Sequence, residues 1–194
     1  MYEINIKDIS ALILAGGKSR RMGRDKGLLK YQGKSLCGHI IEAVAPCCSE
    51  LFIVTKHPEY ARFGIPLLTD NYSNKGPLAG IEAGLMASSK LYQLVLSCDM
   101  PLLSSTILKK LCVQASDTKT ICHFNDQDRI QPLPGLYPTN LVSILQKSIH
   151  ENQLSLSGFL KNQACQAIDL TAQEKKQLLN INDSTDYHQL NHDH

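Results

Sequence analysis

Four short apolar runs divide the first half of the chain, and stretches of helical spacing stand between them. Each run is continuous and partly β-branched, which is typical of strands that are buried on both faces of a sheet. The intervening segments repeat apolar residues at helical spacing, and the last of them opens on Ser104, a residue type that caps helices. We expect strands at 11–15, 51–55, 66–68 and 92–97, and helices at 35–45, 78–87 and 104–115. This alternation predicts an α/β fold with a mostly parallel central sheet and helices on both faces.

The pattern loosens in the second half of the chain. Between residues 118 and 137, acidic residues and two prolines interrupt the apolar positions, so this segment is either a pair of strands that extends the sheet or a cover over the substrate. Helical spacing returns at 140–150 and 155–162, a short strand is expected at 165–168, and a last helix is expected from about Asp183. No internal repeat or low-complexity linker breaks this order, and a length of 194 residues predicts a single domain.

The composition narrows the class of protein. Hydrophobic residues make up 43% of the chain, and the net charge of +2 is too small to suggest a general nucleic-acid or membrane binder. No segment reaches the length of about eighteen apolar residues that a membrane helix requires, and the polar, acid-containing N-terminus is unlike a secretory signal. The seven cysteines form no CxxC pair, so we expect free thiols, with Cys47 and Cys48 as filler near a helix end rather than a redox pair. These features predict a cytoplasmic protein with no nucleic-acid or membrane partner.

Glycines and polar residues follow the four predicted strands of the first half. Gly16 and Gly17 come after the first strand, and Thr55 comes after the second. Asp70 follows the third strand and Asp99 follows the fourth. Ligands of open parallel sheets bind beyond the carboxyl ends of the strands. We therefore expect these residues to converge on one crevice.

The turn after the first strand opens a dense basic loop. A strand that breaks at two glycines exposes backbone N–H groups, and the loop adds Arg21, Lys26 and three further basic residues. Such a loop suits a polyanion such as a nucleoside triphosphate; the alternative is a solvated basic turn behind a core strand. The spacings of the Walker motif and of the dinucleotide-binding motif are both absent, which argues against P-loop NTPases and nicotinamide enzymes.

Asp99, within SCDMPLL, is the candidate metal ligand. Mg²⁺ favours one or two carboxylates together with phosphate oxygens and water, so a single acid at the end of a strand needs few protein partners. The alternative is a turn or helix-capping acid ahead of Pro101. Beside the basic loop, Asp99 would complete a site for a nucleotide and Mg²⁺.

These residues carry a resemblance to a known family. LILAGGKSRRMGRDKGLL resembles the opening motif of nucleotidyltransferases, and GPLAGIEAGL, SCDMPLL and NINDSTDY resemble the central, metal-aspartate and late asparagine motifs of the MobA-like molybdenum cofactor guanylyltransferase family. The resemblance runs from about residue 10 to residue 190, strongly up to 101 and mostly at the level of pattern from 118 to 170. It implies a three-layer, Rossmann-like nucleotidyltransferase fold in one domain, 1–194, with a nucleotide-binding half at about 9–101 and an acceptor-binding half at about 102–190.

The family's reaction is the transfer of GMP from GTP to the terminal phosphate of molybdenum-bound molybdopterin, with release of pyrophosphate. The resemblance therefore implies GTP and molybdenum-bound molybdopterin as substrates and Mg²⁺ as the cofactor. It leaves open a transient contact with other proteins of molybdenum cofactor biosynthesis or with target molybdoenzymes.

The resemblance also implies roles for individual residues. Lys26 and Arg21 would bind the triphosphate and Asp99 would bind Mg²⁺, and these three form the catalytic set. Backbone groups at the end of the first strand and the Asp70 side chain would contact the nucleoside, and Asn182 would lie near the metal or the phosphates. The residues implied to bind the nucleotide are Leu14, Ala15, Gly16, Gly17, Lys26, Thr55, Asp70, Gly80, Asp99 and Asn182.

The chain departs from the family pattern at two places. Val54 or Thr55, depending on the alignment, stands where the family has an asparagine after the second strand, and Ser184 or Thr185 replaces the proline of the late motif. On the acceptor side, Arg129 is either a ligand of the acceptor's phosphate or an exposed loop arginine. Three alternatives stay open: a cytidylyltransferase acting on the same pterin, another small-phosphate nucleotidyltransferase, and an inactive nucleotide-binding module that regulates a partner.

Overall fold

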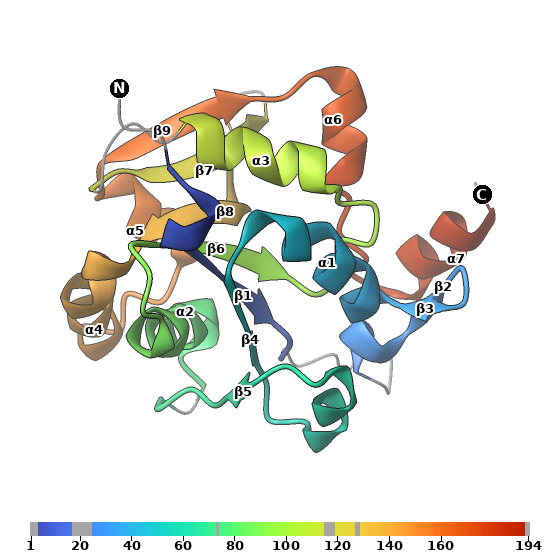
Figure 1. The fold of residues 1–194 in the computed structure, drawn as a ribbon, viewed down its shortest axis with the longest axis horizontal. Helices are drawn as coiled ribbons and strands as arrows, with labels where there is room; N and C mark the ends of the chain where they lie inside the picture. The colour runs from blue at the N-terminus through green and yellow to red at the C-terminus, as the bar shows by residue number, and fades with distance from the viewer. Residues whose placement is uncertain (1–3, 17–24, 73, 115–118, 127–128, 193–194) are drawn as a thin grey trace.

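A seven-stranded sheet forms the centre of the protein (Figure 1), which is described here from a computed structural model covering residues 4–16, 25–72, 74–114, 119–126 and 129–192. The strand order is β5-β4-β1-β6-β8-β7-β9. All neighbouring strands pair in parallel except the two pairs that β8 makes with β6 and β7. The mostly parallel sheet predicted from the sequence is thus confirmed. Its strands are β1 (Ile9–Leu14), β4 (Glu50–Val54), β5 (Leu67–Leu68), β6 (Tyr92–Ser97), β7 (Ile121–Asp126), β8 (Arg129–Pro138) and β9 (Cys165–Asp169).

Helices cover both faces of this sheet (Figure 1), because its central strands send apolar side chains alternately to either side. In β1, Ile9, Ala11 and Ile13 join one buried cluster, whereas Leu12 joins the other. The first cluster is closed by α1 (Leu36–Val44) and α3 (Ser105–Gln114), and the second by α2 (Gly76–Ala87), α4 (Val142–His150) and α5 (Leu156–Lys161). The three-layer α/β fold expected from the sequence is confirmed.

The irregular stretch around residues 118–137 turns out to be a pair of strands that extends the sheet. Strand β8 runs antiparallel between β6 and β7, and the β7–β8 register shifts between His123 and Phe124. The backbone is tightly folded here, since a Cβ on Gly135 would lie 2.7 Å from the carbonyl oxygen of Pro132. This irregular geometry accounts for the loss of a clear alternation in the sequence.

Several short elements were not predicted. Helix α6 (Ala172–Gln177) begins with a capping box in which the Thr171 and Glu174 side chains each accept a hydrogen bond from the other residue's backbone. The T-x-x-E spacing in the sequence was a usable signal for this helix. A small hairpin, β2 (Lys30–Tyr31) and β3 (Lys34–Ser35), was also missed. The remaining short helices are η1 (Ile6–Asp8), η2 (Lys26–Leu28), η3 (Ala45–Cys47), η4 (Pro58–Phe63) and η5 (Thr139–Leu141).

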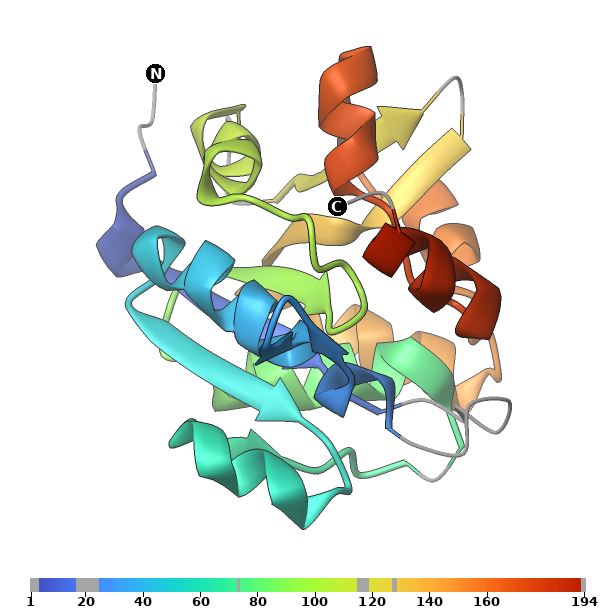
Figure 2. The ribbon, with the colours of Figure 1, turned by 90° about the vertical axis from the view of Figure 1, so that its right-hand side faces the viewer.

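The last helix, α7 (Ser184–His192), returns to the β2–β3 hairpin from the far end of the sequence (Figure 2). Tyr31, Leu36, Ile181 and Leu190 form a small buried cluster between them. The Tyr187 hydroxyl donates to the backbone carbonyl of Lys30. The C-terminal helix therefore packs beside the β2–β3 hairpin.

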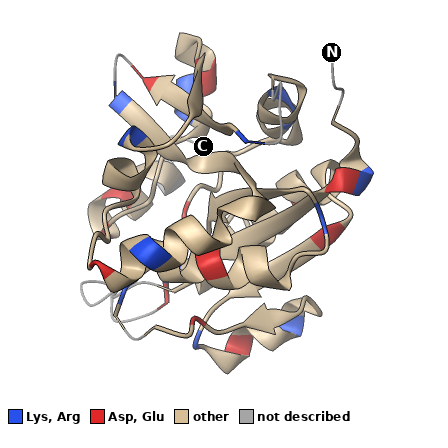
Figure 3. Ribbon diagram, turned by 90° about the vertical axis from the view of Figure 1, so that its left-hand side faces the viewer, with Lys and Arg blue, Asp and Glu red and all other residues tan. Residues whose placement is uncertain are grey.

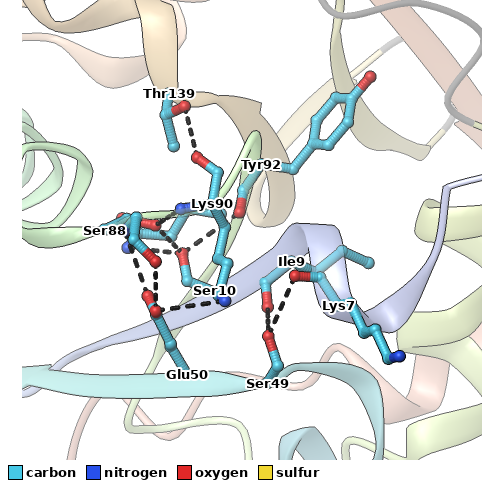
Figure 4. Close-up of polar contacts among 11 residues, drawn as sticks. Lys7, Ile9, Ser10, Ser49, Glu50, Ser88, Lys90, Tyr92 and Thr139 are labelled. Carbon is cyan, nitrogen blue, oxygen red and sulfur yellow. Dashed lines mark hydrogen bonds and ion pairs between the residues drawn. The ribbon is translucent and has the colours of Figure 1, made fainter.

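A buried polar network ties the amino ends of the central strands together (Figure 4). Ser10 Oγ donates to the carbonyl oxygen of Tyr92 at 3.2 Å and accepts from Ser88 Oγ at 2.7 Å. Lys90 Nζ lies 3.4 Å from Glu50 Oε1 at the same end of the sheet. These contacts lie at the end of the sheet opposite to the strand ends from which a ligand site is expected.

The state of the cysteines and the distribution of charge in the structure match what the composition predicts. All seven cysteines are free, and burial raises the pKa of the Cys37 thiol to about 12 and that of Cys48 to about 11, so these two thiols stay protonated near neutral pH. Basic and acidic positions are interspersed over the face in Figure 3. Within the described part of the chain, no helix is long and apolar enough to cross a membrane.

Candidate nucleotide site

A cavity of about 640 Å³ opens at the carboxyl ends of β1, β4, β5 and β6 and at the start of α2. A site at this edge is what the topology of a parallel sheet favours, because the loops that leave neighbouring strands converge there. Five residues that the sequence assigned to nucleotide binding line the cavity, namely Leu14, Gly16, Thr55, Asp70 and Gly80. The predicted convergence of these strand ends on one crevice is confirmed.

Some backbone groups at the end of β1 already form hydrogen bonds with neighbouring strands and are not available to a ligand. The Ala15 amide donates to the carbonyl oxygen of Val54 at 2.9 Å, and the Leu14 carbonyl accepts from the amide of Cys98 at 3.3 Å. A nucleoside contact through the backbone of Ala15 therefore has only its carbonyl to use. Gly16 is exposed on the cavity wall, and a Cβ at this position would have no heavy atom within 4 Å. The predictions for Gly17 and Arg21 lie outside the described residues.

Asp70 offers an acceptor to a ligand in the cavity. Lys56 Nζ lies 3.3 Å from Asp70 Oδ1, which makes an ion pair between the residues that follow β4 and β5. The pair lacks hydrogen-bond geometry, and Oδ1 is buried without a hydrogen-bond donor among the described residues. Leaving a buried carboxylate oxygen without a donor is unfavourable. The Lys56 ammonium offsets part of this cost, and the partly exposed Asp70 side chain, which lines the cavity, has a second carboxylate oxygen for a ligand hydroxyl or N–H group.

Thr55 and Gly80 shape the wall of the cavity. Thr55 is buried, and its Oγ1 accepts a hydrogen bond from the backbone amide of His57 at 3.1 Å. A Cβ on Gly80 would lie 3.0 Å from Leu14 Cδ2 and 3.4 Å from Val54 Cγ1, so glycine lets α2 approach the ends of β1 and β4 closely. Val54 and Thr55, one of which stands where the family has an asparagine, both lie on this wall.

Lys26 and Asp99 face one another beside the cavity. Lys26 Nζ lies 3.9 Å from Asp99 Oδ2, and both side chains are partly exposed. The Ser97 hydroxyl, which lines the cavity, donates to Asp99 Oδ1 at 2.6 Å. The structure thus brings together the lysine and the aspartate that the sequence assigned to the phosphates and the metal.

The donor set around Asp99 is compatible with Mg²⁺. Asp99 presents a partly exposed carboxylate, and the nearby Ser97 side chain also offers oxygen, the ligand type that Mg²⁺ prefers. No group of three or more His, Cys, Asp or Glu side chains in the described residues could hold a metal ion. A protein site of one carboxylate suits Mg²⁺, which takes most of its ligands from water and substrate phosphates.

Asn182 lies in a second, smaller pocket of about 370 Å³, which Arg129 and Lys175 also line. Its backbone neighbour Ile181 donates to the carbonyl oxygen of Asp99 at 2.9 Å. The second pocket is therefore connected through the backbone to the residue expected to bind the metal. Asn182 was expected near the metal or the phosphates, and that role stays a prediction.

Ser97, Lys75 and Leu133 are among the residues of the cavity wall that were not singled out from the sequence. Ser97 stands two residues before Asp99, and the serine ahead of the aspartate was a weak signal for this contact. Lys75 precedes α2, and its Nζ donates to Asn152 Oδ1 at 2.9 Å. Leu133 comes from β8. The sequence did not place Leu133 at the cavity, because Leu133 reaches it only through the pairing of β8 with β6.

Comparison with solved structures supports the fold. The chain is 21% identical to the molybdopterin-guanine dinucleotide biosynthesis protein A from Archaeoglobus fulgidus, with a TM-score of 0.79 over 94% of this chain and 97% of that chain. It is 14% identical to 4-diphosphocytidyl-2C-methyl-D-erythritol synthase from Anaerococcus prevotii, with a TM-score of 0.69 over 96% of both chains. At these identities the likeness concerns the fold alone.

Comparison with known sequences gives the family. A probable molybdenum cofactor guanylyltransferase from Flavobacterium johnsoniae is 31% identical over 96% of this chain and 98% of its own length. A molybdenum cofactor guanylyltransferase from Syntrophotalea carbinolica is 34% identical over 80% of this chain and 75% of its own. The model of the MobA-like NTP transferase domain matches residues 11–167. The chain therefore belongs to the MobA-like NTP transferase family and is a nucleotidyltransferase.

Proposed function

We propose that this protein transfers GMP from GTP to the terminal phosphate of molybdenum-bound molybdopterin, with Mg²⁺ as cofactor and pyrophosphate as the second product. The observation that carries the proposal is the cavity at the strand ends, with the Asp70 acceptor on its wall and the Lys26–Asp99 pair beside it. The names of the relatives from Flavobacterium johnsoniae and Syntrophotalea carbinolica support the choice of substrates.

The reaction asks for alignment and charge neutralisation rather than for a general base. An oxygen of the acceptor phosphate forms a bond to the α-phosphorus of GTP while the bond from that phosphorus to the pyrophosphate oxygen breaks. The acceptor phosphate is already an anion, so no proton has to be removed from it. Catalysis then depends on holding the two phosphates in line and on neutralising the charge that develops on the oxygens.

Lys26, together with a metal ion held by Asp99, would neutralise most of this developing charge. The Lys26 ammonium would contact the triphosphate, and the Asp99 carboxylate, oriented by the Ser97 hydroxyl, would hold the metal ion. Bound Mg²⁺ contributes positive charge that neutralises phosphate oxygens. Asp70, which lines the cavity, would accept a hydrogen bond from the nucleoside through its second carboxylate oxygen, Oδ2.

The acceptor would lie on the side of the second pocket. Arg129 and Lys175 bring positive charge to that pocket, and Asp126 and Asp186 bring negative charge. The backbone contact from Ile181 to Asp99 joins this pocket to the proposed metal ligand. We infer a cytoplasmic location, which suits seven free cysteines.

Nucleotide selectivity tests the proposed function. The purified protein is incubated with Mg²⁺, molybdenum-loaded molybdopterin and, separately, GTP, CTP or ATP, and pyrophosphate release is measured. We expect release with GTP and much less with the other two nucleotides. A preference for CTP would identify a cytidylyltransferase. Nucleotide binding without any pyrophosphate release would identify an inactive binding module.

Replacing Asp70 with asparagine is expected to raise KM for GTP about 10-fold and to change kcat much less. Asparagine keeps the size of the side chain but removes the negative charge, and a hydrogen bond to a charged group is worth about 1.5–3 kcal/mol. Steady-state kinetics with GTP as the varied substrate measures the effect. Asp8→Asn, at the opposite end of the sheet, is the matched control. An unchanged KM in Asp70→Asn would remove Asp70 from the nucleoside site.

Replacing Arg129 with glutamine is expected to raise KM for the pterin acceptor about two- to fivefold and to leave KM for GTP unchanged. The factor is small because Arg129 is exposed, and an exposed ion pair contributes only about 0.2–1 kcal/mol. The control is Lys161→Gln, another exposed cation, at the end of α5. If both variants behave like the wild type, Arg129 is an ordinary surface arginine.

A further inference from the structure

The carboxylate of Asp25 joins two segments that approach the candidate site from different strands. Asp25 caps η2, where its Oδ1 accepts a hydrogen bond from the Gly27 amide at 3.0 Å. The same oxygen accepts from the Tyr60 hydroxyl. Asp25 Oδ2 lies 3.4 Å from Nε2 of His57, which lines the nucleotide cavity, and the Asp25 side chain is only 9% exposed. One carboxylate therefore contacts the residue after Lys26 and two residues of the segment that follows β4.

Burial and a high pKa keep the Tyr60 hydroxyl protonated, so that it always donates its hydrogen bond to Asp25. The residue is completely buried, in η4. Burial is the main cause that raises the pKa of Tyr60 far above its ordinary value, with the nearby Cys98 thiol and Asp25 adding to the shift. The hydroxyl therefore stays protonated and remains a donor to Asp25 at any pH at which the protein would work.

Gly27 packs against the segment after β6 that carries Asp99. A Cβ on Gly27 would lie 2.2 Å from the Tyr60 hydroxyl oxygen and 3.1 Å from Cys98 Sγ. Cys98 is buried and directly precedes Asp99 in the chain. The turn at Gly27 is thus packed between Tyr60 on one side and the Cys98–Asp99 segment on the other, which leaves no room for a larger residue.

We propose that Asp25 and Tyr60 are positioning residues for nucleotidyl transfer: their hydrogen bonds fix the Lys26–Gly27 backbone against the Cys98–Asp99 segment and so hold the Lys26 ammonium opposite Asp99. This inference rests on the proposed function, because it gives Lys26 its task at the triphosphate. Displacing a reacting or neutralising group by about 1 Å can cost as much as 100-fold in rate. A purely structural cap would instead affect stability without selectively lowering kcat.

The test uses three variants of the full chain and one control. Asp25→Ala removes all the contacts of the carboxylate. Tyr60→Phe removes one hydroxyl and opens no cavity. Asp25→Asn keeps an oxygen for Gly27 and Tyr60, and so serves as the conservative rescue. Ser10→Ala is the control, because it removes buried hydrogen bonds at the opposite end of β1 and lowers stability without touching the site (Figure 4).

The kinetic outcome separates positioning from stability. We expect Asp25→Ala to lower kcat about 10- to 100-fold and Tyr60→Phe to lower it about 10-fold, which is typical for residues that orient a catalytic group. KM for GTP should stay within about threefold of the wild type, since neither residue is proposed to contact the nucleotide. Asp25→Asn should recover most of the lost kcat, and Ser10→Ala should keep the wild-type kcat. Wild-type kcat in both Asp25→Ala and Tyr60→Phe would overturn the inference, as would an Asp25→Asn variant no better than Asp25→Ala.

A second measurement needs no turnover and separates this inference from the proposed function. Amide hydrogen exchange is followed at Lys26, Gly27, Leu28 and Leu29 in the nucleotide-free protein. We expect faster exchange in Asp25→Ala and Tyr60→Phe, and unchanged exchange at these amides in Ser10→Ala. Unchanged exchange in all variants would overturn the anchoring role. A wild-type protein that releases no pyrophosphate from any nucleotide would instead refute the proposed function, whatever the exchange shows.

Discussion

Replacing Lys26 with methionine is expected to lower kcat for nucleotidyl transfer about 100- to 1000-fold, the usual cost of removing one charged contact to a transition state. Methionine keeps an unbranched side chain of similar length, so the neighbouring turn at Gly27, which packs between Tyr60 and Cys98, should survive. What is lost is the ammonium group, which lies 3.9 Å from Asp99 Oδ2 and would neutralise charge on the departing pyrophosphate. Pyrophosphate release with Mg²⁺, GTP and the pterin acceptor measures kcat.

Lys90→Met is the matched control for this experiment. Lys90 is also partly buried and pairs with a carboxylate, Glu50, at 3.4 Å, but it lies at the amino ends of the strands (Figure 4). Both variants should unfold within a few degrees of the wild type, because a partly exposed ion pair contributes about 1 kcal/mol or less. If Lys26→Met turns over like Lys90→Met, the ammonium has no part in the reaction.

Replacing Asp99 with asparagine is expected to reduce transfer about 100- to 1000-fold as well, for a different reason. Asparagine can still accept the hydrogen bond that the Ser97 hydroxyl now donates to Asp99 Oδ1 at 2.6 Å. It is a much poorer ligand for Mg²⁺, which favours carboxylate oxygens. The variant should therefore keep its fold and require a higher Mg²⁺ concentration to reach half of its maximal rate. Titrating Mg²⁺ at saturating GTP measures this requirement.

Glu50→Gln provides the control for the carboxylate, since Glu50 is partly buried and pairs with a lysine away from the cavity. Its rate and its Mg²⁺ requirement should match those of the wild type. A variant Asp99→Asn with the wild-type Mg²⁺ requirement would show that Asp99 does not hold the metal. In that case the aspartate would act only as the partner of Lys26.

The strands at the centre of the sheet were the most predictable part of the fold. β1, β4 and β6 are continuous apolar runs because both of their faces are buried, and a signal that comes from burial is visible in the residues themselves. The strand ends were predictable for the same reason, since glycines and polar residues stop each run. The positions of Thr55, Asp70 and Asp99 followed from the strands alone.

The antiparallel strand β8 and the C-terminal segment were less predictable. β8 pairs antiparallel with both of its neighbours, shifts register against β7 and is crowded at Gly135, so its residues follow no simple period. α7 contributes Leu190 to a small cluster with the β2–β3 hairpin. Such a cluster gives each of its segments only one or two apolar residues, too few to form a pattern in the sequence.

In the candidate site, too, the sequence predicted some residues, and only the structure showed how they meet. The opening motif identified Lys26, and the strand-end pattern identified Asp99, but their approach to 3.9 Å depends on residues that neither pattern marks. Tyr60 is one apolar position among many in the sequence, yet its hydroxyl reaches Asp25 from helix η4, which follows a different strand. The need for glycine at position 27 is not visible in the sequence, because the atoms that leave no room for a side chain there belong to Tyr60 and Cys98, which are distant in the chain.

The sequence by itself determined the fold class, the family and the edge of the sheet at which a ligand would bind, because these depend on local pattern and on motifs read along the chain. The tertiary structure alone decided which side chains meet there: Asp70 Oδ1 buried without a donor among the described residues, Lys26 opposite Asp99, and the Asp25 carboxylate between Gly27 and Tyr60. These contacts join residues on different strands and loops, and their geometry follows from how the sheet and its loops pack, which no single segment encodes.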